Sequence, residues 1–238
     1  MDEFLDKYIF PYTKGAFGWA KKTKDGLPVY TPREEALNAA THGVGILIGF
    51  AMLAYSILYH SSALMLTGGI IYSLSLIILY TASTVYHGTG MADTRLKKLL
   101  RLLDHCSIFV LIAGTCTPLM LRLVEQRAGK AEWLFYATIW ALALGGIALL
   151  CVDMKRFKSI SVVMYVAMGA LMILRAEALA AAIGQTGTYL LIGGALSYLL
   201  GLLFYGLGSR NEWMHSVFHV LCLAGSVSHC ICIGVYVL

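Results

Sequence analysis

Residues 63–86 read ALMLTGGIIYSLSLIILYTASTVY, a stretch with no charged side chain that ends next to His87. A helix needs about 20 mostly apolar residues to cross a bilayer core, so this stretch is long enough. The whole chain is similarly apolar: of 238 residues, 59% are hydrophobic and only 13% are charged, and the mean hydropathy is +0.75. Soluble domains average about 45–50% apolar and about 25% charged residues. The sequence therefore predicts an all-α integral membrane protein.

Seven such stretches predict a seven-transmembrane helix bundle that follows a polar tail. The predicted spans are residues 43–60, 63–86, 106–121, 133–152, 159–174, 189–207 and 213–238. The chain thus divides into a cytoplasmic or interfacial tail with a short helix at its end, 1–42, and a transmembrane domain, 43–238. The tail carries aromatic residues that suit the headgroup region: Phe10, Tyr12, Phe17 and Trp19. The spacing Gly45-x-x-x-Gly49 favours close approach of the first span to a neighbour.

Lysine and arginine set the orientation, because they are more frequent in cytoplasmic loops. The tail and the loops after the second, fourth and sixth spans hold most of them, whereas the opposite side holds only Arg122, Arg127, Lys130 and Arg175. This distribution places the N-terminus in the cytoplasm and the C-terminus outside it. The formal net charge of +5 reflects loops that face an anionic leaflet. A nucleic-acid partner is therefore not expected.

Two histidines, His215 and His219, open the last span one helical turn apart, so both side chains project from the same face. His87 ends the second span and Asp104 precedes the third, and the predicted topology puts all four residues at the same cytoplasmic depth. Three neutral imidazoles that leave a fourth position open are typical of a catalytic zinc site. We therefore predict that His87, His215 and His219 bind Zn²⁺.

Two further residues are predicted to assist catalysis at this site. Asp104 is placed to hold a water on the metal and to act as its base, because zinc lowers the pKa of such a water to about 7. Ser83 lies one turn before His87 and would donate a hydrogen bond to a developing oxyanion. Simpler interpretations stay open: histidines four residues apart occur by chance, Asp104 suits the start of a helix, and a bound metal can be structural.

A second polar cluster, made of Glu34, Glu35, Asn38 and His42, precedes the first span. Residues spaced by four share one helical face. The cluster is either a hydrogen-bonded brace beside the metal site or the polar side of an amphipathic helix with capping acids, and the sequence favours neither. Three histidines are predicted to lie outside the site: His60, His105 and His229.

Several motifs occur together, in one order and within one topology. They are Glu35-x-x-Asn38-x-x-x-His42-Gly43, Ser83-x-x-x-His87, Leu103-Asp104-His105, Ile112-Ala113-Gly114-Thr115-Cys116-Thr117-Pro118 and His215-Ser216-Val217-Phe218-His219. From about Glu34 to the C-terminus, the chain resembles the bacterial hemolysin III branch of the progestin and adipoQ receptor family. That family lies within a wider group of membrane hydrolases that includes alkaline ceramidases. Many bacterial members have tyrosine where this chain has Cys116, so any role of that tyrosine is not expected here.

The resemblance implies seven helices in a bacterial plasma membrane, with the N-terminus inside. It implies zinc held by His87, His215 and His219, with Asp104 on the metal-bound water and Ser83 close by. It also implies lipid-linked roles: hydrolysis of ceramide-like amides in receptor relatives, and homeostasis of membrane fluidity or membrane energy in bacterial ones.

Two functions from different classes stay open. One is an intramembrane zinc hydrolase that acts on a lipid amide or ester. The other is a non-enzymatic sensor or homeostasis factor in which zinc joins the helices, in a family whose historical label is cytolysis. A channel or transporter is disfavoured, because no acidic residue near the membrane centre suggests an ion path. The expected partners are a membrane lipid and the bilayer, and the sequence leaves the oligomeric state open.

Overall fold

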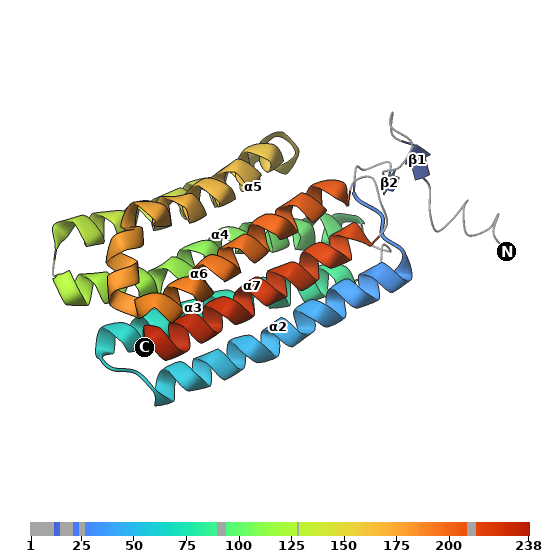
Figure 1. Ribbon diagram of the computed structural model, residues 1–238. Helices are drawn as coiled ribbons and strands as arrows, with labels where there is room; N and C mark the ends of the chain where they lie inside the picture. The colour runs from blue at the N-terminus through green and yellow to red at the C-terminus, as the bar shows by residue number, and fades with distance from the viewer. Residues whose placement is uncertain (1–11, 15–20, 24–26, 90–93, 128, 209–212) are drawn as a thin grey trace.

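The computed structural model describes residues 12–14, 21–23, 27–89, 94–127, 129–208 and 213–238. A short antiparallel pair of strands, β1 (Tyr12–Lys14) and β2 (Lys21–Thr23), precedes a bundle that is entirely helical. The helices are α2 (Pro32–Leu58), α3 (Ala63–Gly88), α4 (Thr94–Arg127), α5 (Lys130–Leu171), the 3-10 helix η1 (Met172–Arg175), α6 (Ala176–Leu207) and α7 (Met214–Tyr236). The predicted all-helical architecture is thus confirmed for the bundle (Figure 1). The predicted interfacial residues Phe10, Phe17 and Trp19 lie outside the described residues.

Five helical stretches of the described chain are long and apolar enough to cross a membrane: Pro32–Leu58, Ala63–Gly88, Arg95–Arg127, Lys130–Leu207 and Met214–Tyr236. Their outward surface is apolar as well. Leu47, Leu144 and Leu203, which lie on three different helices, are between 62% and 68% exposed. Large exposed apolar surfaces are rare on soluble proteins and mark contact with another apolar medium. The chain is a multi-pass membrane protein whose outer side chains face lipid.

A capping box sets the beginning of α2. The Thr31 hydroxyl accepts a hydrogen bond from the Glu34 N–H at 3.3 Å, and the Glu34 carboxylate accepts one from the Thr31 N–H at 2.8 Å. Pro32 follows at the first helical position, where its missing N–H costs nothing. The helix then continues without a break to Leu58. The short helix predicted at the end of the tail and the first predicted span are therefore one continuous helix.

The longest stretch, Lys130–Leu207, is interrupted along its length. Asp153 has an extended backbone (φ −158°, ψ 96°), and its carboxylate accepts a hydrogen bond from the Arg156 N–H at 3.0 Å, as the cap of a new helix does. Figure 1 shows the chain turning back there, at the far end of α5 from its start. A second break follows at Gly184, whose φ of 69° suits glycine. Both breaks fall in loops that the sequence predicts, 153–158 and 175–188.

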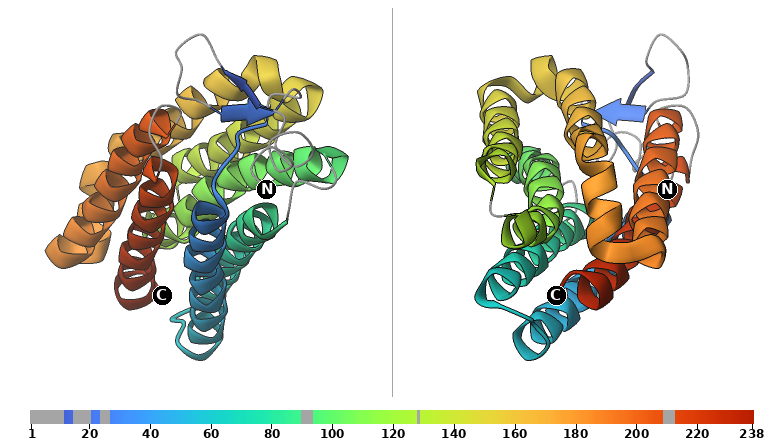
Figure 2. Two further views of the ribbon diagram at one scale, coloured as in Figure 1. Left: turned by 90° about the vertical axis from the view of Figure 1, so that its right-hand side faces the viewer. Right: turned by 60° about the vertical axis from the view of Figure 1, so that its left-hand side comes forward.

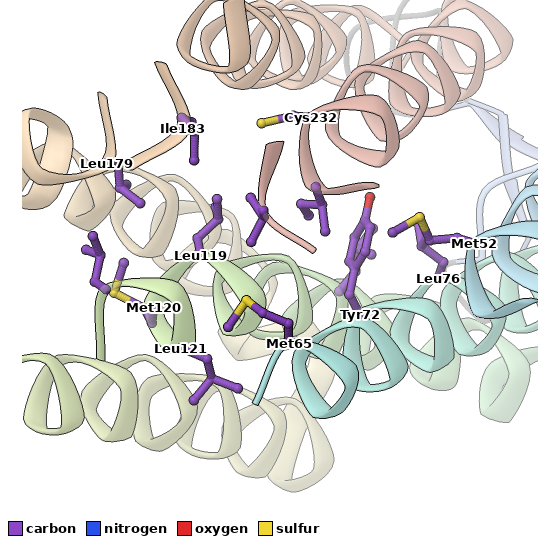
Figure 3. Close-up of a cluster of buried hydrophobic side chains, with 14 of the residues drawn as sticks. Met52, Met65, Tyr72, Leu76, Leu119, Met120, Leu121, Leu179, Ile183 and Cys232 are labelled. Atoms are coloured by element: carbon purple, nitrogen blue, oxygen red, sulfur yellow. The ribbon is translucent and has the colours of Figure 1, made fainter. Parts of the chain in front are cut away.

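Apolar side chains fill the interior of the bundle (Figure 3). Met52 of α2, Tyr72 of α3, Leu119 of α4, Ile183 of α6 and Cys232 of α7 belong to one buried cluster. A second cluster around Phe109 lies between α4 and α5. Burial of this kind contributes about 25 cal/mol for each Å² of apolar surface removed from water, but in lipid the contribution comes mainly from close packing.

Close packing of α2 against α3 depends on two glycines. A Cβ atom at Gly45 would lie 2.4 Å from the ring of Tyr80, and one at Gly49 would lie 2.7 Å from the side chain of Ile77. Real Cβ atoms do not approach other atoms so closely. The close helix approach predicted from the Gly45-x-x-x-Gly49 spacing is therefore confirmed.

Hydroxyl groups inside the bundle hold α3 against α6 and α7. The Tyr80 hydroxyl donates to the Ser226 hydroxyl at 2.7 Å, and the Tyr198 hydroxyl lies 2.7 Å from the same oxygen. The Tyr72 hydroxyl lies 3.3 Å from the Cys230 sulfur. These contacts satisfy polar groups in an apolar interior. They hold the middle of α3 against the middle and second half of α7. The end of the bundle where α3 ends and α7 begins faces the viewer in the left view of Figure 2.

Candidate metal centre

Three histidine side chains meet at the end of the bundle where α2 and α7 begin. His87 lies in the last turn of α3, and His215 and His219 lie in the first turns of α7. One ring nitrogen of each lies within 4.8 Å of the other two, and all three residues are buried. The Nε2 atoms of His215 and His219 are 3.1 Å apart. The structure thus brings together the three histidines that the sequence predicts as ligands.

The nitrogen atoms of this group fit a metal ion. A tetrahedral site with zinc–nitrogen bonds of about 2.0–2.1 Å has nitrogen–nitrogen edges of about 3.3–3.4 Å, close to the separation of the α7 pair. His87 Nδ1 is hydrogen-bonded to Glu35 Oε2 at 2.5 Å, whereas His87 Nε2 is buried and has no hydrogen-bond partner among the described residues. Histidines that bind metals show this division, with one nitrogen on a carboxylate and the other on the ion. An unpartnered buried nitrogen costs about 1–3 kcal/mol, which a bound cation would offset.

Asp104 and Ser83 lie beside the three histidines. Ser83 is buried, one turn before His87 on α3. The Asp104 carboxylate, on α4, interacts with the Ser83 hydroxyl and electrostatically with His87. Its Oδ2 atom lies 3.4 Å from Nδ1 of the neighbouring His105. A carboxylate and a hydroxyl next to three imidazoles are the groups that proton transfer requires. Their nearness to the histidines is observed, and their catalytic roles stay predictions.

The polar residues at the start of α2 cover one side of the centre. Glu34 Oε1 accepts a hydrogen bond from the Trp213 N–H at 2.8 Å and so joins α2 to the residue before α7. The ring of His42 stacks on that of His219, with centroids 3.8 Å apart. Asn38 is fully buried, and its main-chain carbonyl interacts with the imidazole of His219. Both interpretations of this cluster hold in part. Glu34 caps α2 and also hydrogen-bonds to the Trp213 N–H, and Glu35 hydrogen-bonds to His87. The side chains of Asn38 and His42 are buried without a hydrogen-bond partner among the described residues.

Lys97 is a site residue that the sequence analysis missed. It lies in the stretch between the second and third predicted spans, yet it is only 1% exposed. Its ammonium group donates a hydrogen bond to Glu35 Oε1 at 3.1 Å. One sequence signal could have identified it, since Lys97, Arg101 and Asp104 follow the spacing of a single helical face.

Tyr30 is a second site residue that the sequence analysis missed, and no motif of the sequence points to it. Its ring stacks on that of His215, with centroids 4.7 Å apart and an angle of 16° between the planes. Burial raises the pKa of the Tyr30 phenol well above its ordinary value, so the hydroxyl stays protonated. Tyr30 precedes α2 and closes the site from the side of the N-terminal segment.

The three remaining histidines outside α2 form hydrogen bonds with main-chain carbonyls and do not belong to the three-histidine group. The pairs are His60 with Ser56, His105 with Arg101 and His229 with Leu191. His60 lies at the opposite end of α2 from the metal centre. Within the described part of the chain none of these three histidines belongs to the group of ligand candidates, although His105 contacts the Asp104 carboxylate beside it.

Comparison with known proteins places the chain in a family. The profile of the family described as "Haemolysin-III related" matches residues 30–230, a range that includes every residue of the candidate metal centre. The chain belongs to this family. The "Hemolysin-3 homolog" of Bacillus subtilis (strain 168) is 33% identical over 211 residues, which cover 87% of this chain and 96% of the relative. "Hemolysin-3" of Bacillus cereus is 33% identical over 209 residues, with coverages of 87% and 93%.

A more distant relative is human. The "Monocyte to macrophage differentiation factor" of Homo sapiens is 25% identical over 166 residues, which cover 67% of this chain and 66% of the relative. The haemolysin-III match and this relative together confirm the resemblance to the progestin and adipoQ receptor family that the motifs indicate.

Proposed function

We propose that this haemolysin-III family protein is a metal-dependent hydrolase that cleaves an amide or ester bond of a membrane lipid. The observation that carries the proposal is the convergence of three buried histidines from α3 and α7, with Asp104 and Ser83 beside them. Such a set joins a metal-binding group to a proton acceptor and a hydroxyl donor, the parts that hydrolysis of an acyl bond needs. Its place at one end of an apolar bundle suits a substrate whose chains lie in the bilayer.

Zinc is the metal that we assign to His87, His215 and His219. It prefers imidazole ligands, is redox-silent, and is commonly held by three protein side chains in catalytic sites. Bound there, it would supply a Lewis acid for the carbonyl and for the hydrolytic water.

The residues of the chain would share the remaining work. The Asp104 carboxylate would accept a proton from the attacking water and return it to the leaving group. The Ser83 hydroxyl would donate a hydrogen bond to the carbonyl oxygen of the scissile bond as negative charge develops on it. The ring of Tyr30 and the polar face of α2 would keep bulk water away from these groups.

We also propose that the chain crosses a bacterial plasma membrane seven times, with the N-terminus inside. The breaks at Asp153 and near Gly184 would divide Lys130–Leu207 into three spans, because this stretch is too long for one crossing. The tail, 1–42, would then lie in the cytoplasm or at its membrane interface, followed by the transmembrane domain, 43–238. This arrangement puts the metal centre at the cytoplasmic face.

A structural metal is a second candidate. The three histidines come from helices at different positions of the chain, α3 and α7, so an ion between them would clamp these helices together. The protein would then serve membrane homeostasis without catalysis. Loss of the metal would lower the unfolding temperature in both cases, but only the hydrolase would release a lipid product.

Reconstitution in vesicles distinguishes the two candidates. The purified protein is incubated with N-dodecanoyl sphingosine or with dodecanoyl ester lipids, and free dodecanoic acid is measured by mass spectrometry. The hydrolase predicts release of the acid by the parent protein and loss of release, by at least 100-fold, in Asp104→Asn and His219→Ala. Release that persists in both variants would refute the proposed roles, and no release from any acyl lipid would favour the structural metal.

A further inference from the structure

Lys97 is a buried cation that the proposed chemistry does not use. It lies in the first turns of α4, and only 1% of its surface is exposed. Removing an ammonium group from water costs several kcal/mol unless its charge and its N–H donors are matched. The surroundings of Lys97 must therefore compensate for this cost, and they show what the residue does.

All three donors of the Lys97 ammonium group have an acceptor. Nζ lies 3.1 Å from Glu35 Oε1, 2.6 Å from the carbonyl oxygen of Tyr86 and 2.7 Å from that of Thr89. A lysine has three such donors, so the group is fully satisfied. Nζ also lies 4.5 Å from the centre of the Tyr86 ring, within cation–π range.

Two of these acceptors flank a metal-ligand candidate. Tyr86 precedes His87, and Thr89 follows the last residue of α3. The carbonyls at the end of a helix lack partners within the helix and carry partial negative charge, so a cation stabilises them. Lys97 thus fixes the main chain on both sides of His87.

The third acceptor connects Lys97 to the imidazole itself. The carboxylate of Glu35 is shared: Oε1 accepts from Lys97, and Oε2 lies 2.5 Å from His87 Nδ1. An ionised carboxylate can only accept hydrogen bonds, so His87 must donate from Nδ1 and keep the lone pair on Nε2. A chain of contacts therefore runs from α4 through α2 to the lone pair that would face the metal.

We propose that Lys97 is a positioning residue of the metal centre. Its ammonium group holds the Glu35 carboxylate and the last turn of α3, and through them it sets the tautomer and the direction of His87. The inference rests on the proposed metal site and adds to it a second residue of α4, beside Asp104, whose hydrogen bonds go to Glu35 and to main-chain carbonyls rather than to an imidazole. If Lys97 only held α3 against α4, its effect on zinc affinity would be independent of Glu35, because it would not act through that carboxylate.

A double-mutant cycle tests the proposal with Zn²⁺ alone as the probe. The proteins are the parent, Lys97→Met, Glu35→Gln and the double variant, each purified in detergent and freed of metal. Zinc affinity is measured by competition with a chelator. Each single substitution should weaken zinc binding roughly 10–100-fold, as loss of a residue that supports a metal ligand does. The double variant should bind zinc no more weakly than the single variant with the lower affinity, because Lys97 and Glu35 act through the same series of contacts to His87.

Two further measurements separate positioning from folding. Lys98→Met changes the exposed neighbour of Lys97 and should bind zinc as the parent does. The ¹⁵N shifts of the metal-free protein should show His87 protonated at Nδ1 in the parent and a mixture of tautomers in Lys97→Met. If Lys97→Met does not fold, Lys97→Gln, which removes the charge but keeps two donors, takes its place.

Each outcome decides the question. Parent-like zinc affinity in Lys97→Met, or losses that simply add in the double variant, would overturn the positioning role and leave the three-histidine site intact. A parent protein that binds no zinc would overturn the site and the positioning role together.

Discussion

His215 is the ligand candidate that aromatic side chains enclose most closely. Tyr30 stacks on it almost in parallel, and Tyr205 and Phe218 lie 6.0 Å and 5.5 Å away between ring centroids. An aromatic cover restricts the imidazole to one orientation and limits access of water to it. The side chain of Tyr30 should therefore slow the release of a metal from the site.

Substitution of Tyr30 tests this cover. Tyr30→Ala is expected to release zinc to an excess of chelator roughly 10-fold faster than the parent, in the range of residues that support metal ligands. Tyr30→Phe keeps the stacked ring and should release zinc at the parent rate. Equal rates in the parent and in Tyr30→Ala would show that the ring does not protect the site.

For single residues, the sequence identifies the metal-ligand candidates but not the residues that hold them in position. His215 and His219 are recognisable because a spacing of four is a local property of a helix. The spacing of Lys97 from Asp104 places both on one helical face, but the sequence does not show that the ammonium group is buried, because its acceptors are the Glu35 carboxylate and the carbonyls at the end of α3. Those acceptors are distant in the chain and meet only in the folded protein.

Among the elements, the contact between α2 and α3 is decided by residues without side chains. Gly45 faces the ring of Tyr80, which in turn lies edge-on to His42, with centroids 4.9 Å apart. Any side chain at residue 45 would push α3 away and disturb the stack beside the metal centre. In contrast, a Cβ atom at Gly43, on the same helix, would meet nothing within 4 Å.

These two glycines form a matched pair of substitutions. Gly45→Ala should destabilise the protein by roughly 1–3 kcal/mol, the usual cost of overpacking a filled interior. Gly43→Ala should be neutral or stabilising by up to about 1 kcal/mol, because alanine favours a helix. Thermal unfolding in detergent measures both. Unfolding temperatures that fall equally, or not at all, would contradict the close contact.

The limits of sequence-based prediction differ for the elements. Most predicted spans end within a few residues of a helix end or break, because charged and polar stretches separate the apolar runs. The third span, predicted as 106–121, is wrong at both ends: α4 runs from Thr94 to Arg127, because the helix continues through charged residues such as Lys97 and Arg101. The start of α2 lies well before the predicted span because a capping box and Pro32, rather than hydropathy, determine it. The interruptions of Lys130–Leu207 are visible in the sequence as a charged segment near Asp153 and as Gly184, but the path of the chain between them is set by packing.

For the whole molecule, the site has a functional meaning only with a defined orientation in the membrane. The metal centre lies where α2 and α7 begin, whereas Leu238 lies at the opposite end, where its carbonyl accepts a hydrogen bond from the Ser61 N–H at 2.8 Å. The excess of lysine and arginine on the side of the metal centre predicts that this side is cytoplasmic.

Fusions at Leu238 test the orientation. Alkaline phosphatase, which is active only outside the cytoplasm, should be active when fused there, and green fluorescent protein should remain dark. A fusion of alkaline phosphatase within residues 90–93, in the predicted cytoplasmic loop between the second and third spans, should be inactive. The reverse pattern would put the metal centre on the outer face.

The most direct test of the account is the metal content of the purified protein, measured by mass spectrometry beside three single substitutions. The parent should contain one zinc ion per chain, and His87→Ala and His219→Ala should contain almost none while remaining folded. His60→Ala, at the other end of α2, should keep the parent content. A metal-free parent after purification with zinc present, or full zinc content in the His87→Ala and His219→Ala proteins, would contradict a metal centre built from α3 and α7.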